Sequence, residues 1–133
     1  MFANCQMGGM NLGVPDVCLT PVPSPVGPVP TPIPYPNIAL GMTALPPTAS
    51  LKVLISAGPA HNLMTSIPIS NGDNTGLNMG VASGMVMGPS RHMMGSSNVL
   101  FGGMPATKMT SMTGQNGLSL NAPGLTLVPA QFK

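Results

Sequence analysis

Proline occupies every second position over one long stretch of this chain, and this spacing constrains the fold more than any other feature. The residues concerned are Pro21, Pro23 and Pro25, then Pro28, Pro30, Pro32, Pro34 and Pro36. Successive N–H groups of an extended strand point to opposite edges, so alternate prolines remove every donor from one edge only. The prolines change from odd-numbered to even-numbered positions at Val26-Gly27, so the donor-free edge switches sides there. We expect residues 15–39 to lie extended on the protein's own surface without recruiting another strand; the alternative is a Pro-rich linker or groove ligand.

The remainder of the chain is typical of an all-β protein of short strands. Gly or Pro interrupts almost every window of ten residues, so long helices are not expected. Short apolar or β-branched runs, each bounded by Gly, Asn, Ser or Pro, predict the strands. They lie at residues 51–57, 64–70, 81–87, 98–101, 118–120 and 125–128. We expect a single small all-β domain over residues 1–133.

One segment of the sequence is echoed further along the chain. Residues 50–66 and 97–111 share Val-Leu and Pro-Ala pairs at the same spacing, and both end in Met-Thr-Ser. We interpret the echo as one hairpin used twice, with a turn at Gly and Pro. Repeated hairpins suggest a shape with internal pseudo-symmetry.

The chain carries very little charge. Only six residues are charged, and the net charge is +2. Nucleic-acid binding is not expected, because there is no basic cluster and the aromatic residues are only three Phe and one Tyr. Such a surface must hide its apolar groups or lie against another protein. There is no run of about 18 apolar residues and no signal peptide is recognisable, so we expect the protein to be made in the cytoplasm.

Two segments resemble a known family. The stretch GVPDVCLTPVPSPVGPVPTPIPYPNIA resembles the N-terminal signature of PAAR-like proteins of type VI secretion systems. NVLFGGMPATKMT resembles the PAAR segment itself, although Thr107 and Lys108 stand where the family name reads Ala-Arg. The resemblance implies a pointed β-domain whose base caps a trimeric VgrG spike, with one copy per trimer. Its point would help to puncture target membranes.

The resemblance also carries expectations about partners and location. Many family members bear an attached toxin domain, whereas we expect this chain to be a stand-alone tip. It would be a monomer on its own, and separately encoded effectors or their chaperones are further possible partners. It would contact the target membrane transiently and leave the cell with the spike. The alternatives are the tip of a related phage-like contractile injector, a disordered Pro-rich adaptor and a small metal-dependent hydrolase.

A metal site is also implied, because PAAR domains generally bind zinc through His and Cys side chains. The chain holds four such residues, Cys5, Cys18, His61 and His92. Zinc is usually bound by four N or S ligands in a tetrahedron, so these four are the predicted ligands. The resemblance argues most directly for Cys18, which lies inside the signature. Alternatives are a metal-free tip with two surface histidines, a Cys5–Cys18 disulfide, and copper bound by the Met-rich runs.

Catalytic chemistry has little support. Asp16 and Asp73 are the only carboxylate side chains, and no Gly-x-Ser-x-Gly motif or phosphate-binding glycine pattern occurs. Asp16 is explained by a turn beside Pro15. The protein is predicted not to be an enzyme.

Overall fold

The computed structural model describes residues 2–117 and 121–128, and strands dominate this part of the chain. Two single turns of 3-10 helix, η1 (Gly41–Thr43) and η2 (Pro46–Thr48), are its only helical elements. The all-β fold class is confirmed. In the part of the chain that the structure describes, no helix is long and apolar enough to cross a membrane.

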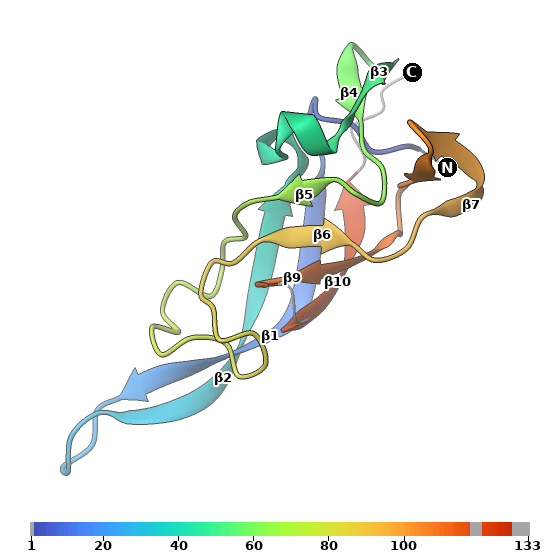
Figure 1. Cartoon of the computed structure of the whole chain (residues 1–133). Helices are drawn as coiled ribbons and strands as arrows, with labels where there is room; N and C mark the ends of the chain where they lie inside the picture. Colours follow the sequence, from blue (N-terminus) through green and yellow to red (C-terminus); the bar gives the residue numbers. More distant parts are fainter. Residues whose placement is uncertain (1, 118–120, 129–133) are drawn as a thin grey trace.

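The strands form one large sheet and two small ones (Figure 1). The six-stranded sheet has the order β2-β1-β10-β9-β6-β5. Its strands are β1 (Met10–Val22), β2 (Val29–Leu40), β5 (Ser66–Ile67), β6 (Ser90–His92), β9 (Met112–Gln115) and β10 (Ala122–Val128). The two-stranded sheets are β3 (Ser50–Ile55) with β4 (Gly58–Ala60), and β7 (Ser96–Phe101) with β8 (Met104–Ala106).

The alternating prolines lie in a long hairpin formed by β1 and β2. Pro21 lies opposite Pro30. Neither residue can donate, so this is a non-hydrogen-bonded pair, and the flanking pairs Thr20–Thr31 and Val22–Val29 carry the ladder bonds. The proline positions therefore face away from the partner strand.

The predicted donor-free edge is therefore present, but the segment does not lie along the surface as one extended strand. The chain reverses between β1 and β2, and Gly27 adopts a positive φ of 116° in the turn. Since the change from odd-numbered to even-numbered prolines falls inside this turn, the prolines remove donors from the outer edges of both strands, at Pro21 in β1 and at Pro30, Pro32 and Pro34 in β2. A glycine suits the turn because it adopts positive φ without steric cost.

The molecule tapers toward this hairpin. Figure 1 shows the β1–β2 turn at the narrow end, while the N-terminus, β3–β4 and β7–β8 gather at the opposite, broader end. The fold therefore places its proline hairpin and its repeated hairpins at opposite ends.

Two of the predicted strands are wrong or too long. Residues 81–87 form turns, in which Val81 N–H donates to Val17 O and Gly84 N–H donates to Gly80 O. Met79 before this range, and Gly84 and Met87 within it, adopt positive φ, which interrupts an extended strand. Of residues 64–70 only β5 is a strand, and residues 118–120 lie outside the described residues. The prediction for residues 125–128 falls within β10.

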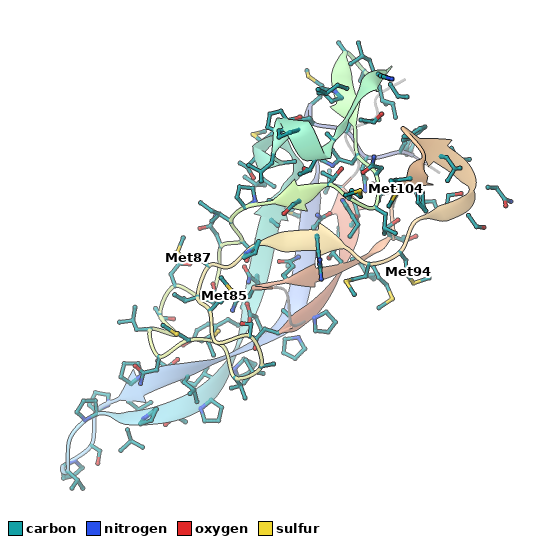
Figure 2. The ribbon with its side chains drawn as sticks, in the orientation of Figure 1. Met85, Met87, Met94 and Met104 are labelled. Carbon is teal, nitrogen blue, oxygen red and sulfur yellow. The ribbon has the colours of Figure 1, made fainter. Side chains whose placement is uncertain are left out.

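The interior of the molecule is mostly polar. Ala39, Ala44 and Ile67 form a small buried apolar cluster, whereas the other buried side chains are largely Asn, Ser, Thr, Asp and His. Large apolar side chains lie outside, as Figure 2 shows for Met85 and Met94. Hydrogen bonding between buried polar groups therefore contributes more to this fold than it does in a typical apolar core.

Candidate functional site: a three-fold end and a buried acidic cluster

Three chain segments occupy equivalent positions at the broad end of the molecule. They are residues 2–7, 59–64 and 105–110, and together they form what we call the three-fold end. Each segment pairs with the next by an antiparallel bridge at the same relative position. The bridges are Cys5–Ala60, Asn62–Ala106 and Lys108–Ala3.

A closed cycle of backbone hydrogen bonds joins the three segments. Asn4 N–H donates to Thr107 O at 3.1 Å, Thr107 N–H donates to His61 O at 3.4 Å, and His61 N–H donates to Asn4 O at 2.9 Å. A second set of three backbone hydrogen bonds joins the same three segments, with each donor two residues further along its segment. Its bonds run from Gln6 N–H to Pro59 O, from Leu63 N–H to Pro105 O and from Met109 N–H to Phe2 O, each 2.9 Å long. The broad end therefore has approximate three-fold symmetry within one chain.

The two repeated hairpins precede two of these segments in the same register. Ser50 pairs with Ala60 in β3–β4, and Ser96 pairs with Ala106 in β7–β8. Sequence reasoning found these two copies and missed the third. Residues 2–7 share only an alanine and a methionine with residues 59–64, so the third copy is visible in the backbone pairing alone.

The surface of the three-fold end is apolar and carries positive charge. Leu54 on β3 is 64% exposed and Leu100, at the equivalent place on β7, is 57% exposed. Lys52 and Lys108 are exposed here, whereas both aspartates of the chain are fully buried elsewhere. The end therefore suits a partner surface that is apolar and neutral or acidic.

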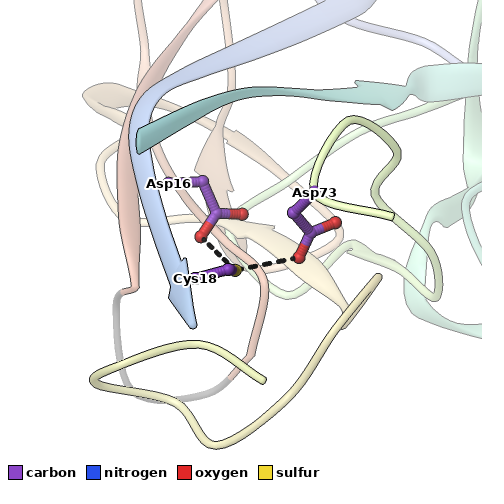
Figure 3. Close-up of side chains that lie close together, drawn as sticks. All are labelled: Asp16, Cys18 and Asp73. Atoms are coloured by element: carbon purple, nitrogen blue, oxygen red, sulfur yellow. Dashed lines mark hydrogen bonds between the residues drawn. The ribbon is translucent and has the colours of Figure 1, made fainter. Parts of the chain in front are cut away.

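A second site lies beside the base of the proline hairpin. Asp16 and Cys18 are two residues apart on β1, so their side chains face the same side of the strand, toward Asp73 (Figure 3). The sulfur of Cys18 lies 3.6 Å from Asp16 Oδ1 and 3.5 Å from Asp73 Oδ2. All three side chains are fully buried.

Three asparagines surround the carboxylate of Asp16. Asn37, Asn116 and Asn121 each donate a side-chain N–H to it. The amide oxygen of Asn116 accepts from Gly88 N–H at 2.9 Å, and that of Asn121 accepts from Ala82 N–H at 2.8 Å. These backbone contacts fix both amides with their N–H groups toward Asp16. Sequence reasoning assigned Asp16 to a turn and missed the asparagines, because nothing in their spacing along the chain brings them together.

The buried environment keeps the proton on the Cys18 thiol. The pKa of Cys18 is raised to about 12, first by burial and then by the nearby charges of Asp16 and Asp73. Burial also raises the pKa of Asp73, against the opposing hydrogen bond from Met87 N–H. Cys18 is therefore a neutral thiol at neutral pH when no cation is bound.

The donor set of this cluster could hold a metal ion. One oxygen or sulfur from each residue lies within 4.8 Å of the others. Tetrahedral zinc, with Zn–S of about 2.3 Å and Zn–O of about 2.1 Å, separates its sulfur and oxygen ligands by about 3.5 Å. The observed sulfur–oxygen distances of 3.6 and 3.5 Å match this value, so the three residues fit as three of the four ligands.

The four predicted zinc ligands do not form one group in the described part of the chain. His61 and His92 lie together, with ring centroids 6.1 Å apart. They are not surface residues, since their exposed fractions are 2% and 3%. Cys5 lies in the three-fold end, and both cysteines are free, so there is no Cys5–Cys18 disulfide. Of the four, only Cys18 belongs to a cluster of three possible ligands.

The two histidines are buried as neutral rings. Burial lowers the pKa of His61 to about 4. Burial, and then the neighbouring His61, lower the pKa of His92 to about 3. Both ring nitrogens of His92 and Nε2 of His61 have no hydrogen-bond partner among the described residues. This pair is a second place with unused ligand atoms, but residues 2–117 and 121–128 bring no third ligand to it.

Comparison with known families identifies the chain. The sequence model of the Toxin PAAR-like domain matches residues 9–124. The chain belongs to this family. No curated protein and no solved structure matches it. The PAAR-like match places the protein in the context of type VI secretion.

The family match covers the two sites unequally. The matched residues, 9–124, include the acidic cluster of this PAAR-like protein, which is formed by Asp16, Cys18 and Asp73. They also include two of the three segments of its three-fold end. Residues 2–7, which complete the cycle, lie before the matched region. The three-fold closure therefore depends on a segment that the family match does not include.

Proposed function

We propose that this PAAR-like protein caps the trimeric VgrG spike of a type VI secretion system, with one copy per trimer. The three-fold end would dock on the blunt end of the spike, and the proline hairpin would lead and sharpen it. The observation that carries the proposal is the closed cycle through Asn4, His61 and Thr107. A single chain can contact three identical subunits in similar ways only when it presents similar surfaces three times.

The surface chemistry of the two ends supports this orientation. The three-fold end exposes apolar side chains on both repeated hairpins, as an interface core requires. Met104 lies near this end (Figure 2), and methionine side chains adapt to an imperfect match. A disordered adaptor would not have the paired strands described above, and the family match favours a type VI system over another contractile injector.

The role we propose is structural and not enzymatic. The protein would stay in the cytoplasm until the machine fires, and would then leave with the spike and help to puncture the target membrane. Effectors or their chaperones would be further partners. The family match supports the spike-associated, structural part of this role.

Native mass spectrometry with the cognate spike tests the capping role. We expect one copy of this chain per VgrG trimer. Replacing both Leu54 and Leu100 by Asp should abolish the complex, because each change places a charge in the apolar interface. Val26→Asp, at the narrow end, is the matched control and should still bind. A stoichiometry of three copies per trimer, or binding by the double variant, would contradict the proposal.

We further propose that the ion held by Asp16, Cys18 and Asp73 is zinc, and that it braces the base of the hairpin. Zinc bound there would neutralise two buried carboxylates and hold a loop against β1. Cys18→Ala should lower the zinc content measured by mass spectrometry of the purified protein, together with the melting temperature. Cys5→Ala is the control and should keep its zinc. Equal zinc content in the two variants would remove the assignment.

A further inference from the structure

In the outer part of the proline hairpin, nearly every backbone N–H is either hydrogen-bonded or missing because the residue is proline. Between residues 19 and 35, seven positions are proline and have no N–H. The N–H groups of Thr20, Val22, Val29, Thr31, Ile33 and Tyr35 belong to the hydrogen-bonded pairs of the ladder. Leu19 donates to Met79 O, Val26 to Ser24 Oγ and Gly27 to Ser24 O. Within these described residues, only Ser24 keeps an N–H without a partner.

The polar side chains of the same region also find partners inside the hairpin. Thr20 Oγ1 and Tyr35 Oη share a hydrogen bond of 2.6 Å across the two strands. Thr31 Oγ1 donates to Val29 O, and Ser24 Oγ accepts from Val26 N–H. There is no charged residue between Asp16 and Lys52. Val26, at the turn, is 95% exposed. This surface can therefore leave water at low cost in lost donor and side-chain hydrogen bonds.

The carbonyl groups behave differently from the donors. A proline keeps its C=O, and at Pro30, Pro32 and Pro34 the C=O points away from β1, like the missing N–H. The outer edge of this part of β2 therefore accepts hydrogen bonds and donates none. A protein strand would pair with such an edge poorly, because its own carbonyls would find no donors. A ligand that supplies only donors fits better.

We propose that residues 19–35 insert into the interfacial layer of a lipid bilayer whose head groups carry N–H donors, of which phosphatidylethanolamine is the type. The exposed valines and proline rings would enter the acyl boundary, and head-group ammonium groups would donate to the outward carbonyls. The outward carbonyls exclude stable spanning, since hydrocarbon offers them no partner. Insertion is therefore shallow, about 5–10 Å, as for other interfacial segments. This inference rests on the proposed function only in that capping leaves the hairpin as the leading end.

Fluorescence of the full-length chain on vesicles tests the proposal. The protein has no tryptophan, so Val26→Trp gives a single reporter at the turn. We expect its emission to shift to the blue on vesicles of phosphatidylcholine with phosphatidylethanolamine. Partitioning should be several-fold weaker on phosphatidylcholine alone, whose choline group has no N–H. Anionic phosphatidylglycerol should give no gain, because the segment has no cation. Leu54→Trp, at the opposite end, is the control reporter and should not shift.

The donor-free edge is tested by a second variant on the Val26→Trp background. Replacing both Pro32 and Pro34 by Ala returns two outward N–H groups and should weaken partitioning into the ethanolamine vesicles several-fold. Pro47→Ala in η2, whose proline lies outside the hairpin, is the matched control and should partition unchanged. Circular dichroism confirms that each variant is folded before it is compared.

The outcomes that would overturn the proposal are distinct. They are no blue shift on any vesicle, equal partitioning with and without ethanolamine head groups, or binding that depends on phosphatidylglycerol. An equal shift of the Leu54→Trp reporter would show adsorption of the whole apolar surface and would overturn it too. The vesicle assay contains no spike protein and the native mass spectrometry contains no lipid, so either proposal can fail while the other stands.

Discussion

At the scale of single residues, Asp16 joins parts of the chain that are far apart in sequence. Its carboxylate accepts N–H groups from Asn37 in β2 and from Asn116 and Asn121, about 100 residues further along. Hydrogen bonds to a charged group contribute about 1.5–3 kcal/mol each. Because three amide N–H groups satisfy its oxygens, Asp16 can be buried without leaving unpaired acceptors.

The buried histidine pair makes stability depend on pH. The pKa values of His61 and His92 are lowered by burial from 6.5 to about 4 and about 3, so the unfolded chain binds protons first as the pH falls. The free energy of unfolding should therefore be unaffected by these groups above pH 6.5 and should fall below it. The slope approaches about 1.4 kcal/mol per pH unit for each histidine.

Urea denaturation at several pH values between the lowered and the usual pKa measures this effect. His92→Gln should give a shallower fall than the unmodified protein. The raised pKa of Asp73 acts in the opposite direction, but it is present in both proteins and leaves the comparison intact. Parallel curves for the two proteins would show that His92 does not titrate as described.

At the scale of elements, the two repeated hairpins differ in the residues of their turns. Ser56 and Ala57 join β3 to β4 with φ of 50° and 67°, whereas Gly102 and Gly103 join β7 to β8 with φ of 64° and 83°. Both pairs lie in the left-handed region, which a two-residue hairpin turn requires. Only the second pair consists of residues that adopt it without strain. The first hairpin therefore carries backbone strain in its turn that the second does not.

Glycine at the strained position should stabilise the first hairpin. Ala57→Gly removes a left-handed penalty of about 1–2 kcal/mol, offset in part by the greater freedom of glycine in the unfolded chain. We expect the free energy of unfolding to rise by about 0.5–1 kcal/mol, measured by urea denaturation. Ala82→Gly, at a residue without positive φ, is the control and should lower stability slightly. A loss of stability in Ala57→Gly would contradict the strain argument.

The elements themselves were only partly predictable. Prolines at every second position all remove donors from the same edge of a strand, so the donor-free edge could be derived from proline spacing alone. The pairing of β1 with β2 could not be derived, because proline spacing shows which edge is free to pair but not which strand pairs with it. The strand predicted for residues 81–87 is absent for another reason. Their apolar and small side chains suit a strand, but positive φ at Gly84 and Met87 turns the chain away after the single bridge between Gly80 and Cys18 of β1.

At the scale of the whole molecule, the fold class and the pseudo-symmetry followed from the sequence, whereas the cluster of Asp16, Cys18 and Asp73 did not. The echo between residues 50–66 and 97–111 was enough to suggest repeated hairpins. The cluster around Cys18 uses Asp73, which lies in a turn-forming Asn-Gly-Asp stretch and looked like an ordinary loop residue. Ligands that converge from separate loops leave no spacing signal, unlike the short spacings of a zinc finger. Cys18, for which the resemblance argues most directly, belongs to the only group of three possible ligands in the described residues.

The closed cycle at the broad end also sets the order in which the chain can fold. Residues 2–4 pair with residues 107–109, which are synthesised about 100 residues later. Contacts of such long sequence separation slow folding, because a long loop must close before they form. During synthesis, residues 2–4 therefore remain unpaired until residues 107–109 have been made, and the closed cycle at the broad end forms late.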